Sequence, residues 1–109
     1  MMYNVQLSEQ AEKDIRGIYE YIAFDLQSPI AASGQLDRLE EAIYKLDHMP
    51  NRFRRYDKEP WRSRGLRLFA VDNYAVFYIP DVVKKQVTVI RVMYGGRDID
   101  SELRRYTGA

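Results

Sequence analysis

Cysteine is absent from this sequence of 109 residues, and histidine occurs once. The chain therefore has no disulfides, no thiolate metal ligands and no cysteine nucleophile, which excludes disulfide-stabilised folds and zinc fingers. The one histidine, His48, follows a predicted helix, where an imidazole commonly caps the last turn. The sequence predicts neither a metal site nor a cofactor.

Long apolar runs and low-complexity tracts are also missing. No apolar run is long enough to span a bilayer, and residues 1–4 lack the basic and apolar regions of a signal peptide. With 46% hydrophobic and 30% charged residues, but only 6 Gly and 4 Pro, the chain is not of a disordered or collagen-like class. We expect one domain over residues 1–109, located in the cytoplasm, with no membrane partner and no small-molecule substrate.

The N-terminal half is predicted to form a strand and two helices. Residues 3–7 alternate between apolar and polar, which is typical of a half-buried strand. Apolar residues then recur at helical spacing between Ala11 and Ile22, after Ser8 as the N-cap. A second helix is expected to start at Pro29, with Ser28 as its N-cap, and to end near residue 48. Because the link is short, the two helices should form a hairpin.

The C-terminal half changes to an alternating pattern that predicts three strands, at residues 66–71, 74–79 and 86–94. A short helix can follow over residues 98–106. The order β-α-α-β-β-β indicates an α+β fold, a small antiparallel sheet packed on a two-helix hairpin. The other face of such a sheet can stay partly open to a ligand or partner.

Positive charge is concentrated in residues 50–67, where seven Lys and Arg accompany two Asp and Glu, although the whole chain has a net charge of +1. Aromatic residues alternate with these cations, a composition that suits flexible nucleic acid. It equally suits a solvated loop that meets the acidic helices or an acidic partner. The candidate binding residues are Arg54, Arg55, Lys58, Trp61, Arg62 and Arg64, together with Arg91 on the last predicted strand.

Three further positions, and Arg91 again, could carry chemistry. If Arg67 lies on the helix-free face of the sheet, its guanidinium can grip a phosphate; a structural salt bridge is the alternative. Arg91 raises the same question and can be an outward charge on an edge. Tyr94 and Arg97 flank a Gly-Gly break, where a guanidinium can lower the pKa of a phenol and aid proton transfer. The alternative for Tyr94 is a packing role.

Several blocks of the sequence carry a family resemblance through their joint order and spacing. They are YNVQLSEQAEKDI (3–15), IYEYIA (18–23), Pro29 with Ala31 and Ala32, LDHMP (46–50), GLRLFAV (65–71), NYAVFY (73–78) and VIRVMYGGRD (89–98). Together they resemble the RelE/ParE superfamily of toxins from type II toxin-antitoxin modules, many of which are grouped under plasmid stabilisation. The resemblance implies a growth inhibitor that a cognate antitoxin protein silences.

Two mechanisms are implied by this resemblance. RelE-like members cleave messenger RNA at the ribosome without a metal, and there Arg67, Tyr94 and Arg97 would be the catalytic residues, with Arg54, Arg55 and Lys58 as loop cations. However, the tyrosine that RelE-like chains carry after the last strand has no counterpart, since Leu103 falls near that position.

ParE-like members are associated with inhibition of DNA gyrase and need no catalytic set. The ending Tyr94-Gly95-Gly96-Arg97-Asp98 looks more like this branch. We therefore predict a ParE-like toxin that binds gyrase. A RelE-type endoribonuclease acting on ribosome-bound mRNA, and an inactive module that only binds an antitoxin, are the alternatives.

Overall fold

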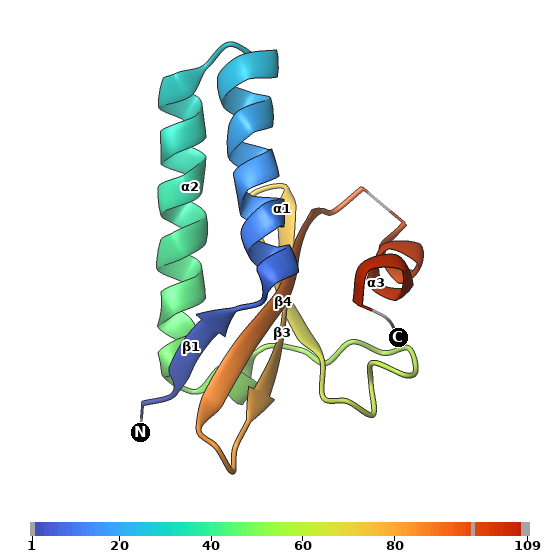
Figure 1. Cartoon of the computed structure of the whole chain (residues 1–109). Helices are drawn as coiled ribbons and strands as arrows, with labels where there is room; N and C mark the ends of the chain where they lie inside the picture. Colours follow the sequence, from blue (N-terminus) through green and yellow to red (C-terminus); the bar gives the residue numbers. More distant parts are fainter. Residues whose placement is uncertain (1, 97, 108–109) are drawn as a thin grey trace.

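The computed structural model describes residues 2–96 and 98–107 and confirms the predicted α+β class and element order (Figure 1). Short 3₁₀ turns at Lys45–Asp47 and Pro50–Arg52 follow the second helix. The strands and α-helices are β1 (Asn4–Leu7), α1 (Glu9–Glu20), α2 (Pro29–Tyr44), β2 (Arg67–Val71), β3 (Tyr74–Asp81), β4 (Gln86–Tyr94) and α3 (Ile99–Thr107).

The two long helices form the predicted hairpin, but only one of the two predicted caps is present. Ser8 caps α1, because its hydroxyl oxygen accepts a hydrogen bond from the Ala11 amide at 3.0 Å. Ser28 makes no side-chain cap bond, so that prediction is wrong. Its backbone, at φ −134° and ψ 77°, departs from the extended conformation in which a cap side chain usually reaches the first turn.

The sheet has the strand order β1-β4-β3-β2 and is mixed. The β2–β3 and β3–β4 pairs are antiparallel, as predicted, but β1 runs parallel to β4 with Asn4 opposite Gln86. The prediction of a wholly antiparallel sheet is therefore wrong at this pair. A parallel pair needs a long crossover, and here everything from α1 to β3 lies between its strands.

The helical hairpin packs on one face of the sheet (Figure 1). Apolar side chains from α1 and α2 meet those of the two central strands, which removes them from water and provides the main stabilisation of the fold. The buried members of this core are Ala11, Ile15, Leu39, Ile43, Leu46, Val76, Tyr78, Val87, Val89 and Val92.

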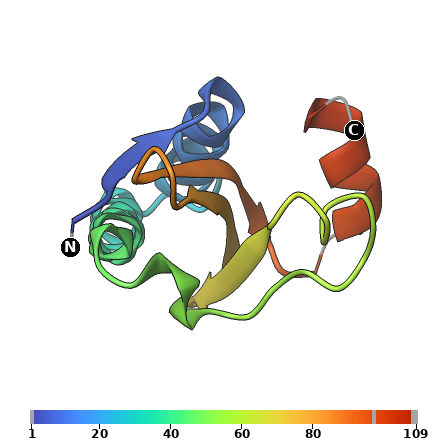
Figure 2. The ribbon, with the colours of Figure 1, turned by 90° about the horizontal axis from the view of Figure 1, so that it is seen from below.

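The opposite face of the sheet is covered by a second core, against the expectation that it would stay partly open. The segment 53–66 folds back, with the Tyr56 amide donating to the Leu66 carbonyl at 2.8 Å, and it lies beside α3 (Figure 2). Leu103 of α3 is fully buried there. The buried members of this second core are Tyr56, Trp61, Leu66, Leu68, Ala75, Phe77, Met93 and Leu103.

Candidate macromolecular interface

The predicted basic segment forms an exposed loop at the edge of the second core. The charged side chains of Arg54, Arg55, Lys58, Arg62 and Arg64 are all exposed, as a docking surface for an anionic partner requires. Their charges are spread along the loop, which gives the loop a positive potential. Arg54 and Lys58 line a cavity of about 330 Å³ that they share with Asp57, Asp98 and Asp100.

Trp61 is the exception in this loop, because its side chain is only 4% exposed. The ring packs in the second core and Arg64 lies over it, with the guanidinium carbon 4.9 Å from the ring centroid. The prediction that Trp61 is available to a partner is therefore wrong. The large ring buries more apolar surface by packing in the second core than it would if it were exposed to solvent on the loop.

Lys58 is used within the molecule, since its ammonium group donates to Asp100 of α3 at 2.7 Å. The Tyr56 hydroxyl donates to the other oxygen of the same carboxylate. The hydrogen bond from Lys58, followed by that from Tyr56, lowers the pKa of Asp100. Burial, and then the hydrogen bond to Asp100, raises the pKa of Tyr56. These contacts tie the basic loop to α3.

Arg67 lies on the face of the sheet that carries the helices. It pairs directly with Tyr78, a member of the hairpin-side core, so the expectation of a helix-free face is wrong. Its guanidinium Nη1 donates to the carbonyls of Asn51 at 3.1 Å and Phe53 at 2.6 Å. Half-buried at the edge strand, the side chain is neither sealed under the hairpin nor, within the described residues, paired with a carboxylate.

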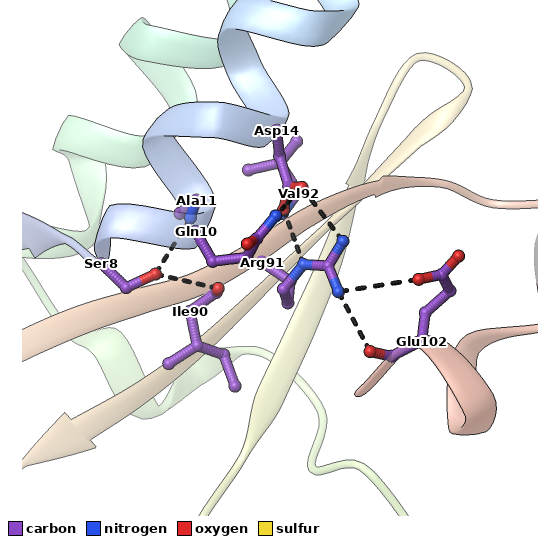
Figure 3. Close-up of polar contacts among 8 residues, drawn as sticks. All are labelled: Ser8, Gln10, Ala11, Asp14, Ile90, Arg91, Val92 and Glu102. Atoms are coloured by element: carbon purple, nitrogen blue, oxygen red, sulfur yellow. Dashed lines mark hydrogen bonds and ion pairs between the residues drawn. The ribbon is translucent and has the colours of Figure 1, made fainter. Parts of the chain in front are cut away.

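Arg91 is buried, at 2% exposure, and is not the outward edge charge that we expected (Figure 3). Its Nε and Nη2 donate to the two oxygens of Asp14, at 2.7 and 3.0 Å. Its Nη1 donates to the backbone carbonyl of Glu102 at 3.1 Å and lies 3.9 Å from the Glu102 carboxylate. Arg91 therefore joins α1, β4 and α3 and is not available to a partner.

The position of β1 explains this burial. β1 pairs with β4 only as far as Val89, so beyond that residue α1 takes the place of the missing strand. The Ser8 hydroxyl donates to the Ile90 carbonyl at 3.0 Å, and Asp14 accepts from the Val92 amide at 2.9 Å. The role of Asp14 was not foreseen, because its only signal in the sequence is a carboxylate one turn along an ordinary amphipathic helix.

Tyr94 is exposed at the end of β4, opposite Tyr74, with the two rings 6.1 Å apart in an edge-to-face arrangement. With Tyr21 of the helical hairpin they line a cavity of about 560 Å³ between α1 and β4. Burial, followed by the neighbouring Tyr21 and Tyr94, raises the pKa of Tyr74. Arg97, the expected partner of Tyr94, lies outside the described residues.

The structure does not bring Arg67 and Tyr94 together. They pair with Tyr78 and Tyr74, four residues apart on β3, and they lie on strands on opposite sides of β3. With about 3.3 Å per residue and about 4.8 Å between strands, their Cα atoms are roughly 16 Å apart. The fully buried Val76 lies between them on the same face. Arg67 is not among the residues that line the cavity beside Tyr94.

Over residues 2–96 and 98–107, no three side chains of His, Asp or Glu gather closely enough to hold a metal ion. No helix among these residues is both long and apolar enough to cross a membrane.

The family model described as the ParE toxin of type II toxin-antitoxin systems, parDE, matches residues 5–99. The chain belongs to the ParE toxin family. It is therefore a toxin of a type II toxin-antitoxin module within the RelE/ParE superfamily, as the sequence predicted. No curated protein matches this ParE-family chain significantly.

Solved structures of similar fold include both branches of the superfamily. A chromosomal ParDE toxin-antitoxin system from P. aeruginosa matches with a TM-score of 0.71 and 18% identity, over 85% of this chain and 96% of that chain. The RelBE2 toxin-antitoxin complex from Mycobacterium tuberculosis has a TM-score of 0.64 and 19% identity, over 86% and 99%. The isolated E. coli RelE toxin has a TM-score of 0.61 and 18% identity, over 96% and 98%. At these identities the likeness establishes the shared fold.

Proposed function

We propose that this ParE-family toxin stops growth by binding a protein target, DNA gyrase, and that a cognate antitoxin keeps it silent. The match of the ParE toxin model over residues 5–99 carries the proposal. The absence of a converged catalytic set in the described residues supports the same choice.

Cleavage of RNA by its own 2′-hydroxyl needs a base, an acid and a stabiliser of the phosphorane charge within hydrogen-bonding reach of one phosphate. Arg67 instead binds two backbone carbonyls, and Tyr94 stands roughly 16 Å away on another strand. Arg91 forms buried ion pairs with Asp14 and Glu102 and is therefore not available to a phosphate. Binding to a protein surface makes no such demand, and these positions are compatible with it.

The antitoxin is the second part of the proposal. The similar structures from P. aeruginosa and Mycobacterium tuberculosis are of a toxin-antitoxin system and a toxin-antitoxin complex, so the fold is one that an antitoxin can cover. On this chain the exposed cations of the basic loop, Arg54, Arg62 and Arg64, offer charge complementarity to an acidic segment of an antitoxin. Docking there would be sensitive to salt, because the charges are exposed.

Purified toxin, with and without the antitoxin encoded beside it, tests the target in two assays. We expect inhibition of supercoiling by gyrase, relief by the antitoxin, and no cleavage of mRNA in a translating extract. Arg67→Met, checked for folding by circular dichroism, should inhibit gyrase as the parent does. Cleavage of mRNA that this variant loses, without any effect on supercoiling, would establish the endoribonuclease instead. Tight antitoxin binding without either activity would leave a module that only binds its antitoxin.

A further inference from the structure

The free end of the helical hairpin exposes four large apolar side chains within ten residues. Tyr21 is 52%, Phe24 67%, Leu26 55% and Ile30 89% exposed. Figure 1 shows the turn between α1 and α2 beyond the end of the sheet and away from α3. We call Tyr21, Phe24, Leu26 and Ile30 the hairpin tip.

The backbone of this region shows why the tip side chains point outward. After α1 the helix widens into a π-helical turn at Tyr21–Asp25, with the Leu26 amide bonded to the Tyr21 carbonyl at 3.0 Å. Gln27 then takes a positive φ of 53° and reverses the chain. Ala23 is the buried residue of this turn. The four large residues are therefore not needed to pack the hairpin, and π-helical turns recur at functional sites.

The apolar area of the tip is large for a chain of this size. Four side chains that are more than half exposed present on the order of 400 Å² of apolar surface, comparable to the largest patch on a typical monomer. Such patches mark interaction sites. A standard protein interface buries about 800 Å² on each partner, so the tip can supply about half of one side. Tyr21 also lines the cavity between α1 and β4, which continues this surface toward Tyr94.

Charge decides which class of partner fits the tip. Residues 17–37 contain Glu20, Asp25 and Asp37 and no Lys or Arg. A nucleic-acid backbone and an anionic lipid surface would both be repelled by these carboxylates. A second copy docked tip to tip would bring like charges together. The partner class that matches both the apolar side chains and the carboxylates of the tip is a protein with an apolar pocket rimmed by Lys or Arg.

We propose that the hairpin tip is the surface with which this toxin grips its protein target, inserting Phe24 and Ile30 into an apolar pocket with a basic rim. The inference rests on the proposed function only in taking the target to be a protein. It assigns target binding to the end of the hairpin and leaves the basic loop, on the other side of the molecule, to the antitoxin.

Matched surface variants test the assignment. Ile30→Asp and Phe24→Ser change residues of the tip, while Val83→Asp, at 92% exposure in the turn after β3, and Tyr44→Ser, at 57% exposure near the other end of α2, serve as controls. Circular dichroism melts should be unchanged for all four, because the side chains are mostly solvated. We expect the tip variants to need at least about tenfold more protein to inhibit supercoiling, as for an interface hot spot, and to lose growth inhibition. The controls should stay within about twofold of the parent.

A charge variant tests the rim. Asp25→Lys should weaken inhibition, and the remaining activity should depend less on salt than that of the parent, because an attractive contact has become repulsive. Unchanged inhibition in Asp25→Lys would overturn the basic rim.

The growth readout separates this inference from the identity of the target. If the parent stops growth without affecting gyrase, gyrase is the wrong target, yet loss of growth inhibition in Ile30→Asp with intact controls still supports the tip. Full growth inhibition by both tip variants would overturn the inference. So would variants that stay toxic but escape the antitoxin, since the tip would then bind the antitoxin. Binding of the parent, but not Ile30→Asp, to lipid vesicles or to itself would likewise overturn it, as would a parent that inhibits neither growth nor supercoiling.

Discussion

Replacement of Arg91 by methionine should be far more damaging than replacement of Arg38, although both arginines form ion pairs of nearly the same length. Arg91 Nε lies 2.7 Å from Asp14, and the two side chains are 2% and 9% exposed. Arg38 Nε lies 2.8 Å from Asp72, with 56% and 42% exposure. The two ion pairs differ in burial, and Arg91 also bonds the second Asp14 oxygen and the Glu102 carbonyl, so the comparison measures what a buried, multiply bonded arginine contributes.

The magnitude follows from what each variant leaves behind. Arg91→Met leaves the buried carboxylate of Asp14 without its cationic partner, and breaking a buried pair in this way lowers the free energy of unfolding by about 3–5 kcal/mol. Asp14 keeps hydrogen bonds from the Val92 amide and the Gln10 side chain, which places the expected loss near the lower value, about 3 kcal/mol. Arg38→Met should cost about 1 kcal/mol or less, because water solvates Asp72.

Urea denaturation of the purified variants, followed by circular dichroism, measures the two costs. A chain of this size has a free energy of unfolding of about 5–15 kcal/mol, so the Arg91 variant should still fold. Its urea midpoint should fall by about 2 M at a slope near 1.5 kcal/mol per M, and that of Arg38→Met by less than about 0.7 M. Equal losses in the two variants, or an Arg91→Met protein as stable as the parent, would refute the reasoning.

Three further outcomes are expected. Ser8→Ala removes the cap of α1 and the bond to Ile90 and should lower the free energy of unfolding by about 1 kcal/mol, measured in urea; no change would mean that water replaces the hydroxyl. Burial raises the pKa of Tyr78 to about 12, so the parent should lose stability from about pH 10 upward, where the tyrosine of the unfolded chain ionises first. In alkaline thermal melts, Tyr78→Phe should lose less stability with rising pH than the parent. The same dependence on pH in both proteins would contradict Tyr78 as the cause. Trp61→Ala should cost about 3–5 kcal/mol in urea, whereas a loss under about 1 kcal/mol would show that the ring is dispensable to the second core.

The periodicity of the sequence was sufficient to predict the elements and their order. Apolar spacing marked α1 and α2, and alternation marked β2, β3 and β4, because each pattern depends on residues that are near one another in the chain. The direction of β1 relative to β4 was not predictable in this way. It depends on how the whole intervening chain crosses the sheet, for which residues 3–7 carry no local signal.

The candidate site was harder to predict for the same reason. Alternation placed Arg67 on a defined face, but which face the hairpin covers is a property of the assembled layers. Arg91 was taken for an edge charge. The sequence predicted that the first strand ends at residue 7, but it did not indicate that this strand pairs with β4 or that Asp14 occupies the edge beyond it. The exposed loop cations were predictable from composition alone. The hairpin tip had a signal that was overlooked, namely apolar residues outside both helical stripes.

The parallel pairing of β1 with β4 has a consequence for how the toxin is made. Residues 4–7 are synthesised well before residues 86–89, the strand with which they pair. The helical hairpin can collapse early, since its contacts are local, but the sheet that supports it cannot be completed until most of the polypeptide has been released. A nascent fragment ending before β4 would lack one of the two central strands and, with it, Arg91. Premature termination of translation should therefore yield an unfolded chain rather than a shortened, active toxin.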